Sequence, residues 1–177
     1  MFNWVTLSSC QDSVPNGLPR DILESEARLA AKILNLPKGN LSILDFVVRE
    51  FSAERQKILQ TFYDLNKSLK PDLVILPALQ DLHQDHATVS IEGLRAFKNS
   101  SVLAYEIPWN NLNFQTTLFV SLEERHVNQK LKALASYESQ SHRPYMNSEF
   151  LKSQLIFRGT QAGAKFAEAF EVLRWNV

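Results

Sequence analysis

One stretch decides the fold expected of this chain. It begins with the apolar run Leu73-Val74-Ile75-Leu76 and continues as Pro77-Ala78-Leu79-Gln80-Asp81-Leu82-His83-Gln84-Asp85-His86. A continuous apolar run is typical of a strand that is buried on both faces of a parallel sheet. In open parallel sheets, ligands gather in the loops beyond the carboxyl ends of the strands. The polar residues 80–86 therefore lie where a substrate pocket is expected.

On both sides of this stretch the sequence alternates predicted strands and helices. Strands are expected at residues 4–7, 41–48 and 102–105, in addition to 73–76. Helices are expected at residues 22–34, 53–70, 86–98, 122–137, 148–157 and 163–172, with Asp21, Ser52 and the pair Ser121 and Glu124 as capping residues. This order predicts the α/β class, as a three-layer, Rossmann-like, mostly parallel sheet in one domain over residues 1–177.

Composition excludes several classes of partner. The 19 basic and 19 acidic side chains cancel, so no charge excess favours nucleic acid or an anionic membrane surface. No stretch approaches the roughly 20 consecutive apolar residues of a membrane span, and residues 1–7 lack the pattern of a signal peptide. Because Cys10 is the single cysteine, no intrachain disulfide can form, and a reducing, cytoplasmic location is expected.

Two histidines and two aspartates fall within the six residues from Asp81 to His86. Neutral imidazole is a common zinc ligand, and a neighbouring carboxylate can hold the ring in the required tautomer. A histidine beside a metal can also stabilise the oxyanion that forms during amide hydrolysis. The alternative is a polar helix start, with Asp85 serving the first turn. Two histidines supply fewer ligands than the three that a catalytic zinc usually takes from protein, so both interpretations stay open on spacing alone.

The residues Pro71-Asp72-Leu73-Val74, followed by Asp81-x-His83-x-Asp85-His86, resemble the second signature of the PIG-L (LmbE-like) zinc-dependent N-acetylglucosamine deacetylases. Arg49-x-Phe51, residues 105–111, Lys132-x-x-Ala135 and Arg158-Gly159 are similar to one bacterial branch of that family, so the likeness covers nearly the whole chain.

The resemblance implies a metal-dependent hydrolase that removes the acetyl group from an N-acetylglucosamine-type sugar conjugate, with zinc as cofactor and an N-acetylated amino sugar as substrate. By position, His86 is the implied metal ligand. His83 is the implied catalytic residue that stabilises the oxyanion, and Asp85 is expected to support it by hydrogen bonding.

The sequence departs from the family at one place. The family carries its remaining ligands and its general base in an Ala-His-Pro-Asp-Asp-Glu segment after its first strand, and no such run occurs in residues 1–177. Residues 4–7 match the family's second strand, so the first strand and helix are expected to be absent. The alternative to a deacetylase is therefore a non-catalytic sugar-binding or partner-dependent remnant of the fold. Exposed sheet backbone would favour association, including a homo-oligomer.

Further substrate-binding candidates are Asp81, Trp109, Arg143 and Tyr145. Trp109 follows a predicted strand and could stack on a sugar ring, although a buried tryptophan is the alternative. Arg143 and Tyr145 lie in a predicted loop that could touch a sugar, where a solvated arginine is the alternative. His126 and His142 are expected to face solvent.

Overall fold

The computed structural model describes residues 1–176 and divides the chain into two compact units, each built from two segments. One unit contains residues Met1–Val48 and Ser121–Glu168, and the other contains Arg49–Val120 and the residues from Ala169. The strands β5 (Leu118–Leu122) and β6 (Phe166–Arg174) each pass from one unit into the other. No helix within the described residues is long and apolar enough to cross a bilayer.

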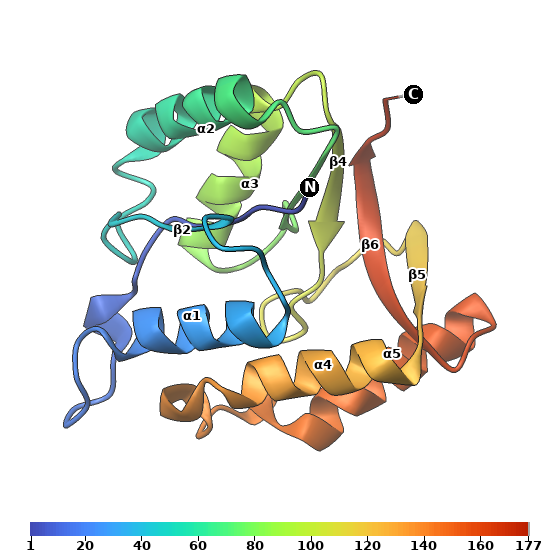
Figure 1. The fold of residues 1–177 in the computed structure, drawn as a ribbon. Coiled ribbons are helices and arrows are strands. Elements are labelled where there is room, and N and C mark those ends of the chain that lie inside the picture. Colours follow the sequence, from blue (N-terminus) through green and yellow to red (C-terminus); the bar gives the residue numbers. More distant parts are fainter. Residues whose placement is uncertain (177) are drawn as a thin grey trace. The chain divides into compact units, whose positions relative to one another are not determined.

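The first unit combines a small sheet with three helices (Figure 1). Its strands β1 (Trp4–Thr6) and β2 (Leu41–Ile43) pair in parallel, with Trp4 opposite Leu41. Its helices are α1 (Ile22–Ile33), α4 (Glu124–Ala135) and α5 (Ser148–Ala162), and its 3-10 turns are η1 (Gln11–Ser13), η2 (Glu138–Gln140) and η3 (Pro144–Met146). Its core centres on three buried residues from α4, α5 and β6, namely Val127, Leu155 and Phe166.

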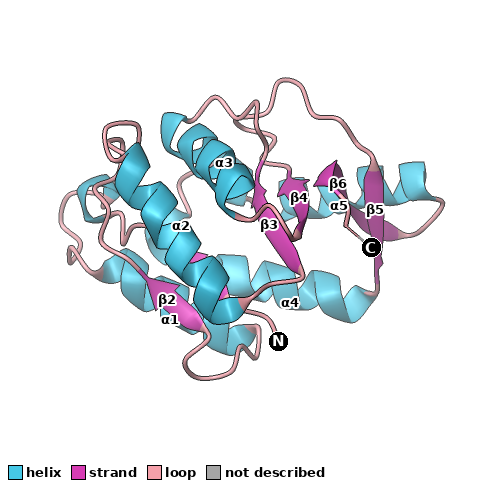
Figure 2. Ribbon diagram, turned by 90° about the horizontal axis from the view of Figure 1, so that it is seen from above, coloured by secondary structure: helices cyan, strands magenta, loops and turns pink. Residues whose placement is uncertain are grey.

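The second unit carries the stretch that opened the sequence analysis. Its elements are α2 (Arg55–Leu69), β3 (Leu73–Pro77), α3 (Gln84–Ala96) and β4 (Ser101–Tyr105), together with the adjoining parts of β5 and β6. The sheet has the order β3-β4-β6-β5, in which β3 and β4 are parallel and β6 is antiparallel to β4 (Figure 2). The predicted parallel pairing is therefore present in both units, and β6 makes the second sheet mixed.

The helices α2 and α3 lie side by side and are joined through one buried carboxylate (Figure 1). The Glu92 side chain is 0% exposed. Its Oε1 accepts hydrogen bonds from Nε and Nη2 of Arg55 at 2.8 and 2.6 Å, and its Oε2 accepts one from Nη1 of Arg95 at 2.6 Å. A buried charge is tolerated when it is paired and hydrogen-bonded, so this cluster fixes α3 against α2.

Strand β3 is covered on one face only. Leu76 is buried against α3, where a Cβ added to Gly93 would lie 2.7 Å from Leu76 Cδ1. Leu73 and Ile75, which share the opposite face, are 46% and 42% exposed. The prediction of a strand buried on both faces is therefore wrong at these two positions. Within the described residues β3 is the terminal strand of its sheet, so its second edge has no strand partner.

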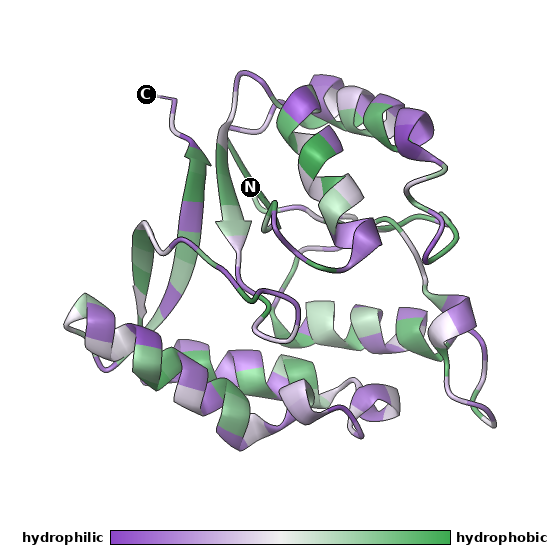
Figure 3. Cartoon of the chain, turned by 180° about the vertical axis from the view of Figure 1, so that it is seen from behind, coloured by the Kyte–Doolittle hydropathy of each residue, from purple (hydrophilic) through white to green (hydrophobic). Residues whose placement is uncertain are grey.

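Several helix and strand boundaries in the structure differ from the predicted ones, and one predicted helix is a strand. Residues 163–172 were expected to form a helix, but Gly163, at φ 68°, ends α5 and β6 follows. Figure 3 shows hydrophobic and hydrophilic residues mixed along β6, whose Phe166, Ala167, Ala169 and Phe170 are buried. Pairing of β6 with its two neighbours β4 and β5 outweighs the local helical preference of these alanines and glutamates. The strand expected at residues 41–48 is confined to β2.

The helix starts also differ from the expected caps. Glu54 takes the N-cap position of α2 in place of Ser52, and Asp21 caps α1 by position without a side-chain hydrogen bond. The capping box of α4 is formed by Glu123 and His126, not by Ser121 and Glu124. Spacing alone could not choose between the pairs Ser121–Glu124 and Glu123–His126, because the two residues of each pair are three positions apart.

Candidate functional site

The loop between β3 and α3 is organised by the buried carboxylate of Asp81, whose side chain is 0% exposed. Its Oδ1 accepts a hydrogen bond from the backbone N–H of His83 at 2.8 Å, and its Oδ2 lies 2.9 Å from Nδ1 of His86. The loop closes because the Asp81 N–H donates to the Ala78 carbonyl at 3.1 Å. Helix α3 then begins at Gln84, with His83 as its N-cap. Asp81 therefore holds both histidines at the start of one helix.

The two imidazole rings stack on each other, with centroids 4.6 Å apart and planes inclined by 22°. Their hydrogen-bond partners fix opposite tautomers. A carboxylate only accepts, so Nδ1 of His86 carries its proton toward Asp81 and Nε2 keeps its lone pair. The Asp85 backbone N–H only donates, at 3.2 Å to Nδ1 of His83, so neutral His83 carries its proton on Nε2. One ring thus offers an acceptor and the other a donor.

The Asp85 carboxylate contacts the backbone of Arg49 and Phe51 and does not contact the His83 ring. Its Oδ2 accepts from the Arg49 N–H at 2.6 Å, and its Oδ1 accepts from the Phe51 N–H at 3.4 Å. Both carboxylate oxygens are therefore occupied by the backbone before α2, where Arg49 has the positive φ of 72°. Asp85 reaches His83 through its backbone N–H and not through its carboxylate. Its carboxylate anchors the start of α3 to residues 49–51.

The surroundings of the loop change the acidity of two groups. Burial, and then the neighbouring His86, lower the pKa of His83 below its ordinary 6.5, against the opposing effects of Asp85 and Asp81. The neutral form of His83 is therefore favoured at neutral pH, where Nε2–H is its donor. Burial, and then the charge of Asp81, raise the pKa of Tyr105 to about 12. Tyr105 accordingly stays a neutral phenol at the carboxyl end of β4.

The segment after β4 forms a second wall beside the histidines. The Asn110 carbonyl accepts from the Leu82 N–H at 3.3 Å. Nδ2 of Asn110 lies 3.4 Å from Nδ1 of His86, a longer contact than the 2.9 Å one with the Asp81 carboxylate, which therefore sets the proton on Nδ1. Asn111 stabilises its own turn, because its Oδ1 accepts from the Ile107 N–H at 2.6 Å. Trp109 is 61% exposed, so the alternative of a buried tryptophan is wrong. The predicted sugar-stacking role of Trp109 stays a prediction.

The remaining candidates lie in the other unit. Nε of Arg143 donates to Gln140 Oε1 at 2.7 Å, and its guanidinium carbon lies 5.9 Å from the centre of the Tyr145 ring. His126 is half-buried and accepts from the Glu123 N–H, so it serves the start of α4, whereas His142 is exposed as expected. The structure thus brings Asp81, His83, Asp85 and His86 together within one unit, together with the loop that carries Trp109.

Sequence reasoning assigned no role to the backbone of Arg49, to Tyr105 or to the position of Asn110 beside His86. Tyr105 could have been found, because it ends a predicted strand on the edge where ligands collect. The contact of Arg49 with Asp85 is made by the backbone N–H of Arg49. Because every residue except proline has this group, the sequence cannot indicate such a contact.

The donors present fit only part of a zinc site. His86 is hydrogen-bonded to a carboxylate through one nitrogen and offers the other, which is the usual arrangement of a metal-bound histidine. However, no group of three or more His, Cys, Asp or Glu side chains that could hold a metal ion occurs among residues 1–176. Both oxygens of Asp85 are engaged, as are both oxygens of Asp81. These side chains alone do not account for a bound catalytic zinc ion, which usually takes three ligands from protein.

No protein-family model matches the sequence. Among solved structures, N,N′-diacetylchitobiose deacetylase from Pyrococcus horikoshii is similar with a TM-score of 0.75 at 18% identity, over 96% of this chain and 71% of that chain. The zinc-inhibited form of teicoplanin deacetylase Orf2 gives 0.70 at 15% identity, over 94% and 84%. The 4-carboxy-2-hydroxymuconate hydratase GalB from Pseudomonas putida KT2440 gives 0.71 at 17% identity, over 98% and 84%.

At these identities the likeness shows the fold, and it confirms the predicted α/β, Rossmann-like class. Deacetylases and a hydratase share this architecture, so the fold by itself does not select the reaction. The choice between reactions rests on the residues of the β3–α3 loop.

Proposed function

We propose that this chain is a PIG-L-type protein whose β3–α3 loop acts on the acetamide of an N-acetylglucosamine-type sugar conjugate, as part of a metal-dependent N-deacetylase. The observation that carries the proposal is the pair of opposite tautomers at His83 and His86. Amide hydrolysis needs a donor for the carbonyl oxygen as it gains negative charge, and Nε2–H of His83 supplies one. Deacetylases among the structural neighbours, including N,N′-diacetylchitobiose deacetylase and teicoplanin deacetylase Orf2, support the same assignment.

The steps assigned to this chain are binding and polarisation of the amide. His83 donates from Nε2 to the acetyl oxygen, and its lowered pKa keeps that donor neutral. Asp81 positions His86, and Asp85 positions the helix start that carries both rings. A bound zinc ion would activate the attacking water, but the described residues do not complete its site. We therefore propose that groups other than the side chains of residues 1–176 supply the remaining zinc ligands.

Elemental analysis of the purified chain, beside a His86→Ala variant, tests the metal part of the proposal. We expect the wild-type chain to bind substoichiometric zinc, and the variant to bind none. Acetate release from N,N′-diacetylchitobiose and from N-acetylglucosamine, measured with added Zn²⁺, tests the reaction. Acetate release that is unaffected by His83→Ala or His86→Ala would refute the assignment of this loop to the reaction.

The alternative function is a non-catalytic, sugar-binding or partner-dependent form of the same fold. The observation that favours it is the second edge of β3, which has no strand partner within residues 1–176, together with the exposed Leu73 and Ile75. An edge strand with exposed apolar side chains invites pairing with another chain. Light scattering that shows an oligomer, dispersed by Ile75→Lys, together with sugar binding without acetate release would support this alternative over the first.

A further inference from the structure

The most exposed large apolar side chains of the described residues, apart from the N-terminal Met1 and Phe2, flank the histidines. They are Leu112, Leu82 and Trp109, which are 80%, 69% and 61% exposed. Leu82 lies in the loop between β3 and α3, and Trp109 and Leu112 lie in the segment after β4. Apolar surface in water is unfavourable, and a group of such side chains commonly marks a binding surface. We call these three residues the apolar rim.

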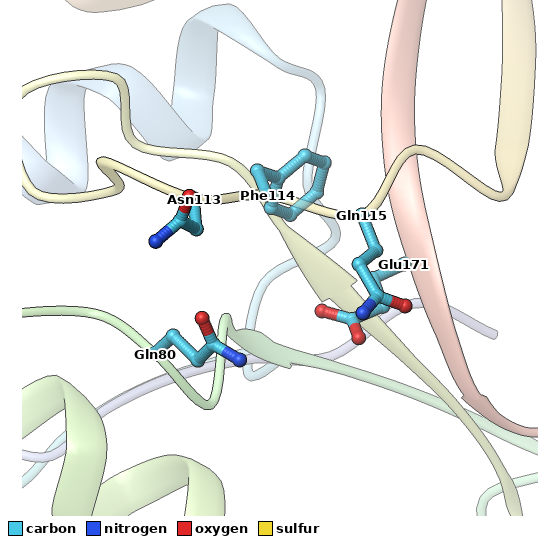
Figure 4. Close-up of a pocket in the computed structure, with 5 residues that line it drawn as sticks. All are labelled: Gln80, Asn113, Phe114, Gln115 and Glu171. Carbon is cyan, nitrogen blue, oxygen red and sulfur yellow. The ribbon is translucent and has the colours of Figure 1, made fainter.

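The two segments that carry the apolar rim lie against each other within one unit. The Leu82 N–H donates to the Asn110 carbonyl at 3.3 Å, so Leu82 lies next to the residue that follows Trp109. The same two segments also meet where Gln80 faces Asn113 across a pocket of about 310 Å³ (Figure 4). The three side chains of the apolar rim therefore belong to neighbouring loops and form one surface feature.

A tight turn holds the apolar side chains of the segment after β4 in place. The N–H groups of Asn110 and Asn111 both donate to the Ile107 carbonyl at 2.9 Å, and Oδ1 of Asn111 accepts from the Ile107 N–H at 2.6 Å. Trp109 lies inside this turn. Its exposure therefore comes from a hydrogen-bonded backbone and not from a loose loop, so a ligand would meet a preformed surface, which lowers the entropic cost of binding.

The apolar rim borders the groups that are proposed to act on the acetamide. Leu82 directly precedes His83, and Nδ2 of Asn110 lies 3.4 Å from Nδ1 of His86. A sugar whose acetamide accepts a hydrogen bond from His83 places its other substituents close to these two loops. The aglycone, which is the group attached to the sugar, is the part of the conjugate that can then reach the apolar rim.

The charges of the two loops favour an uncharged aglycone. Residues 77–86 and 105–118 contain the acidic residues Asp81, Asp85 and Glu106 and no lysine or arginine. A surface that binds an anionic bilayer usually carries basic side chains beside its apolar ones, and these loops carry none. We propose that the apolar rim binds an uncharged alkyl or aromatic aglycone of an N-acetylglucosamine-type conjugate. This proposal rests on the proposed function, because that function supplies the sugar.

The test compares two ligands that share the sugar and the acetamide and differ in the length of an uncharged alkyl chain. They are methyl and hexyl N-acetyl-β-D-glucosaminide, titrated into ¹⁵N-labelled protein without added metal and below the micelle concentration of the hexyl glycoside. We expect the hexyl glycoside to bind roughly tenfold more tightly, which corresponds to burial of about two of the added methylene groups. The indole N–H signal of Trp109 should shift more with the hexyl glycoside than with the methyl glycoside.

Two variants of the apolar rim and one matched control assign this preference to its residues. Leu82→Ser and Leu112→Ser should each lower the affinity for the hexyl glycoside roughly two- to fivefold, because less apolar area is buried, and should leave the affinity for the methyl glycoside unchanged. Leu29→Ser removes a leucine that is 47% exposed on α1 and should change neither affinity. Vesicles of phosphatidylcholine, with or without phosphatidylserine, should not bind the protein in a sedimentation assay.

The proposal is overturned if neither glycoside binds, if the two bind equally, or if both variants keep the full preference for the hexyl glycoside. Vesicle binding that both variants abolish, without a preference for the hexyl glycoside, would assign the apolar rim to a bilayer instead. The proposed function is judged separately, by acetate release. His83→Ala should abolish acetate release and keep the preference for the hexyl chain, so the failure of either proposal can be recognised on its own.

Discussion

Replacing Asp81 with asparagine changes one atom of the site and is expected to reverse the tautomer of His86. The asparagine oxygen can still accept from the His83 N–H, which the structure places 2.8 Å from Oδ1. Its NH2 group then faces Nδ1 of His86, where Oδ2 stood at 2.9 Å. Because an NH2 group donates, Nδ1 must become the acceptor and the proton must move to Nε2. The lone pair that His86 offers to a metal or a substrate is then lost.

The energetic cost follows from the same exchange. A hydrogen bond to a charged group contributes about 1.5–3 kcal/mol, and the neutral bond that replaces it contributes about 0.5–1.5 kcal/mol. The free energy of unfolding of Asp81→Asn should therefore fall by roughly 1–1.5 kcal/mol. Urea denaturation measures this change, and long-range ¹H–¹⁵N spectra of the imidazoles report the tautomer.

Asp72→Asn is the matched control, because Asp72 is exposed and its side chain makes no hydrogen bond within the described residues. It should change neither stability nor the histidine spectra. If His86 kept its proton on Nδ1 in Asp81→Asn, the argument that Asp81 sets the tautomer would be wrong. An unchanged stability would show that the buried carboxylate contributes nothing net to the loop.

Three further predictions concern a buried ion pair, two tightly packed glycines and the titration of His83. Arg55→Ala should lower the free energy of unfolding by about 1.5–3 kcal/mol in urea denaturation, because it leaves Glu92 Oε1 buried without its donors. Gly159→Ala should cost more than Gly93→Ala in thermal melts, since the new Cβ meets backbone oxygens at 2.7 and 2.8 Å in the first case and only side-chain methyls in the second. The pKa of His83 is lowered on folding, so the unfolded chain takes up a proton at His83 at a higher pH than the folded protein does. The stability that comes from neutral His83 should therefore be lost as the pH falls below 6.5. His83→Asn should reduce this loss of stability, measured by urea denaturation between about pH 7 and pH 5.

Each of these predictions has its own check. Arg28→Ala removes an exposed ion pair with Glu24 and should lower the free energy of unfolding by no more than about 0.5 kcal/mol. If Arg55→Ala lowered it by the same amount, burial of Glu92 would add nothing to the strength of its ion pair. Equal melting points for the two glycine variants would contradict the close approach at Gly159. His142→Asn, at an exposed position, should leave the pH dependence unaltered, and a similar effect from both histidine variants would remove the special position of His83.

Much of the second unit could be predicted from its pattern. The apolar stripe of α2 and the break at Pro71-Asp72 located a helix and a strand, and the strand-end rule placed the polar loop at the edge of the sheet. The error at β6 had a physical cause, since Gly163 signals a helix end but the following Phe166-Ala167-Glu168-Ala169 has no strong local preference. Its state is decided by pairing of β6 with β4 and β5, which lie far earlier in the chain and are invisible to local periodicity.

The residues of the candidate site could be named in advance, but their functions could not. A carboxylate near a histidine is a reasonable partner from sequence, and Asp81 and Asp85 were equally eligible. Three-dimensional distance separates them, because Asp81 lies against His86 whereas Asp85 faces the backbone of Arg49 and Phe51. Opposite tautomers depend on whether the nearest group donates or accepts, and neither spacing nor composition carries that information.

The carboxylate of Asp85 has a consequence for any attempt to move this loop to another protein. It bonds to backbone groups 36 and 34 residues earlier in the chain, while its own N–H orients His83. The histidine loop therefore does not form an independent structural unit. If residues 81–86 were grafted onto a foreign strand and helix, the Asp85 carboxylate would be left without its two donors. A transplant that keeps the ring geometry would have to include the turn at residues 49–51 and the helix that follows it.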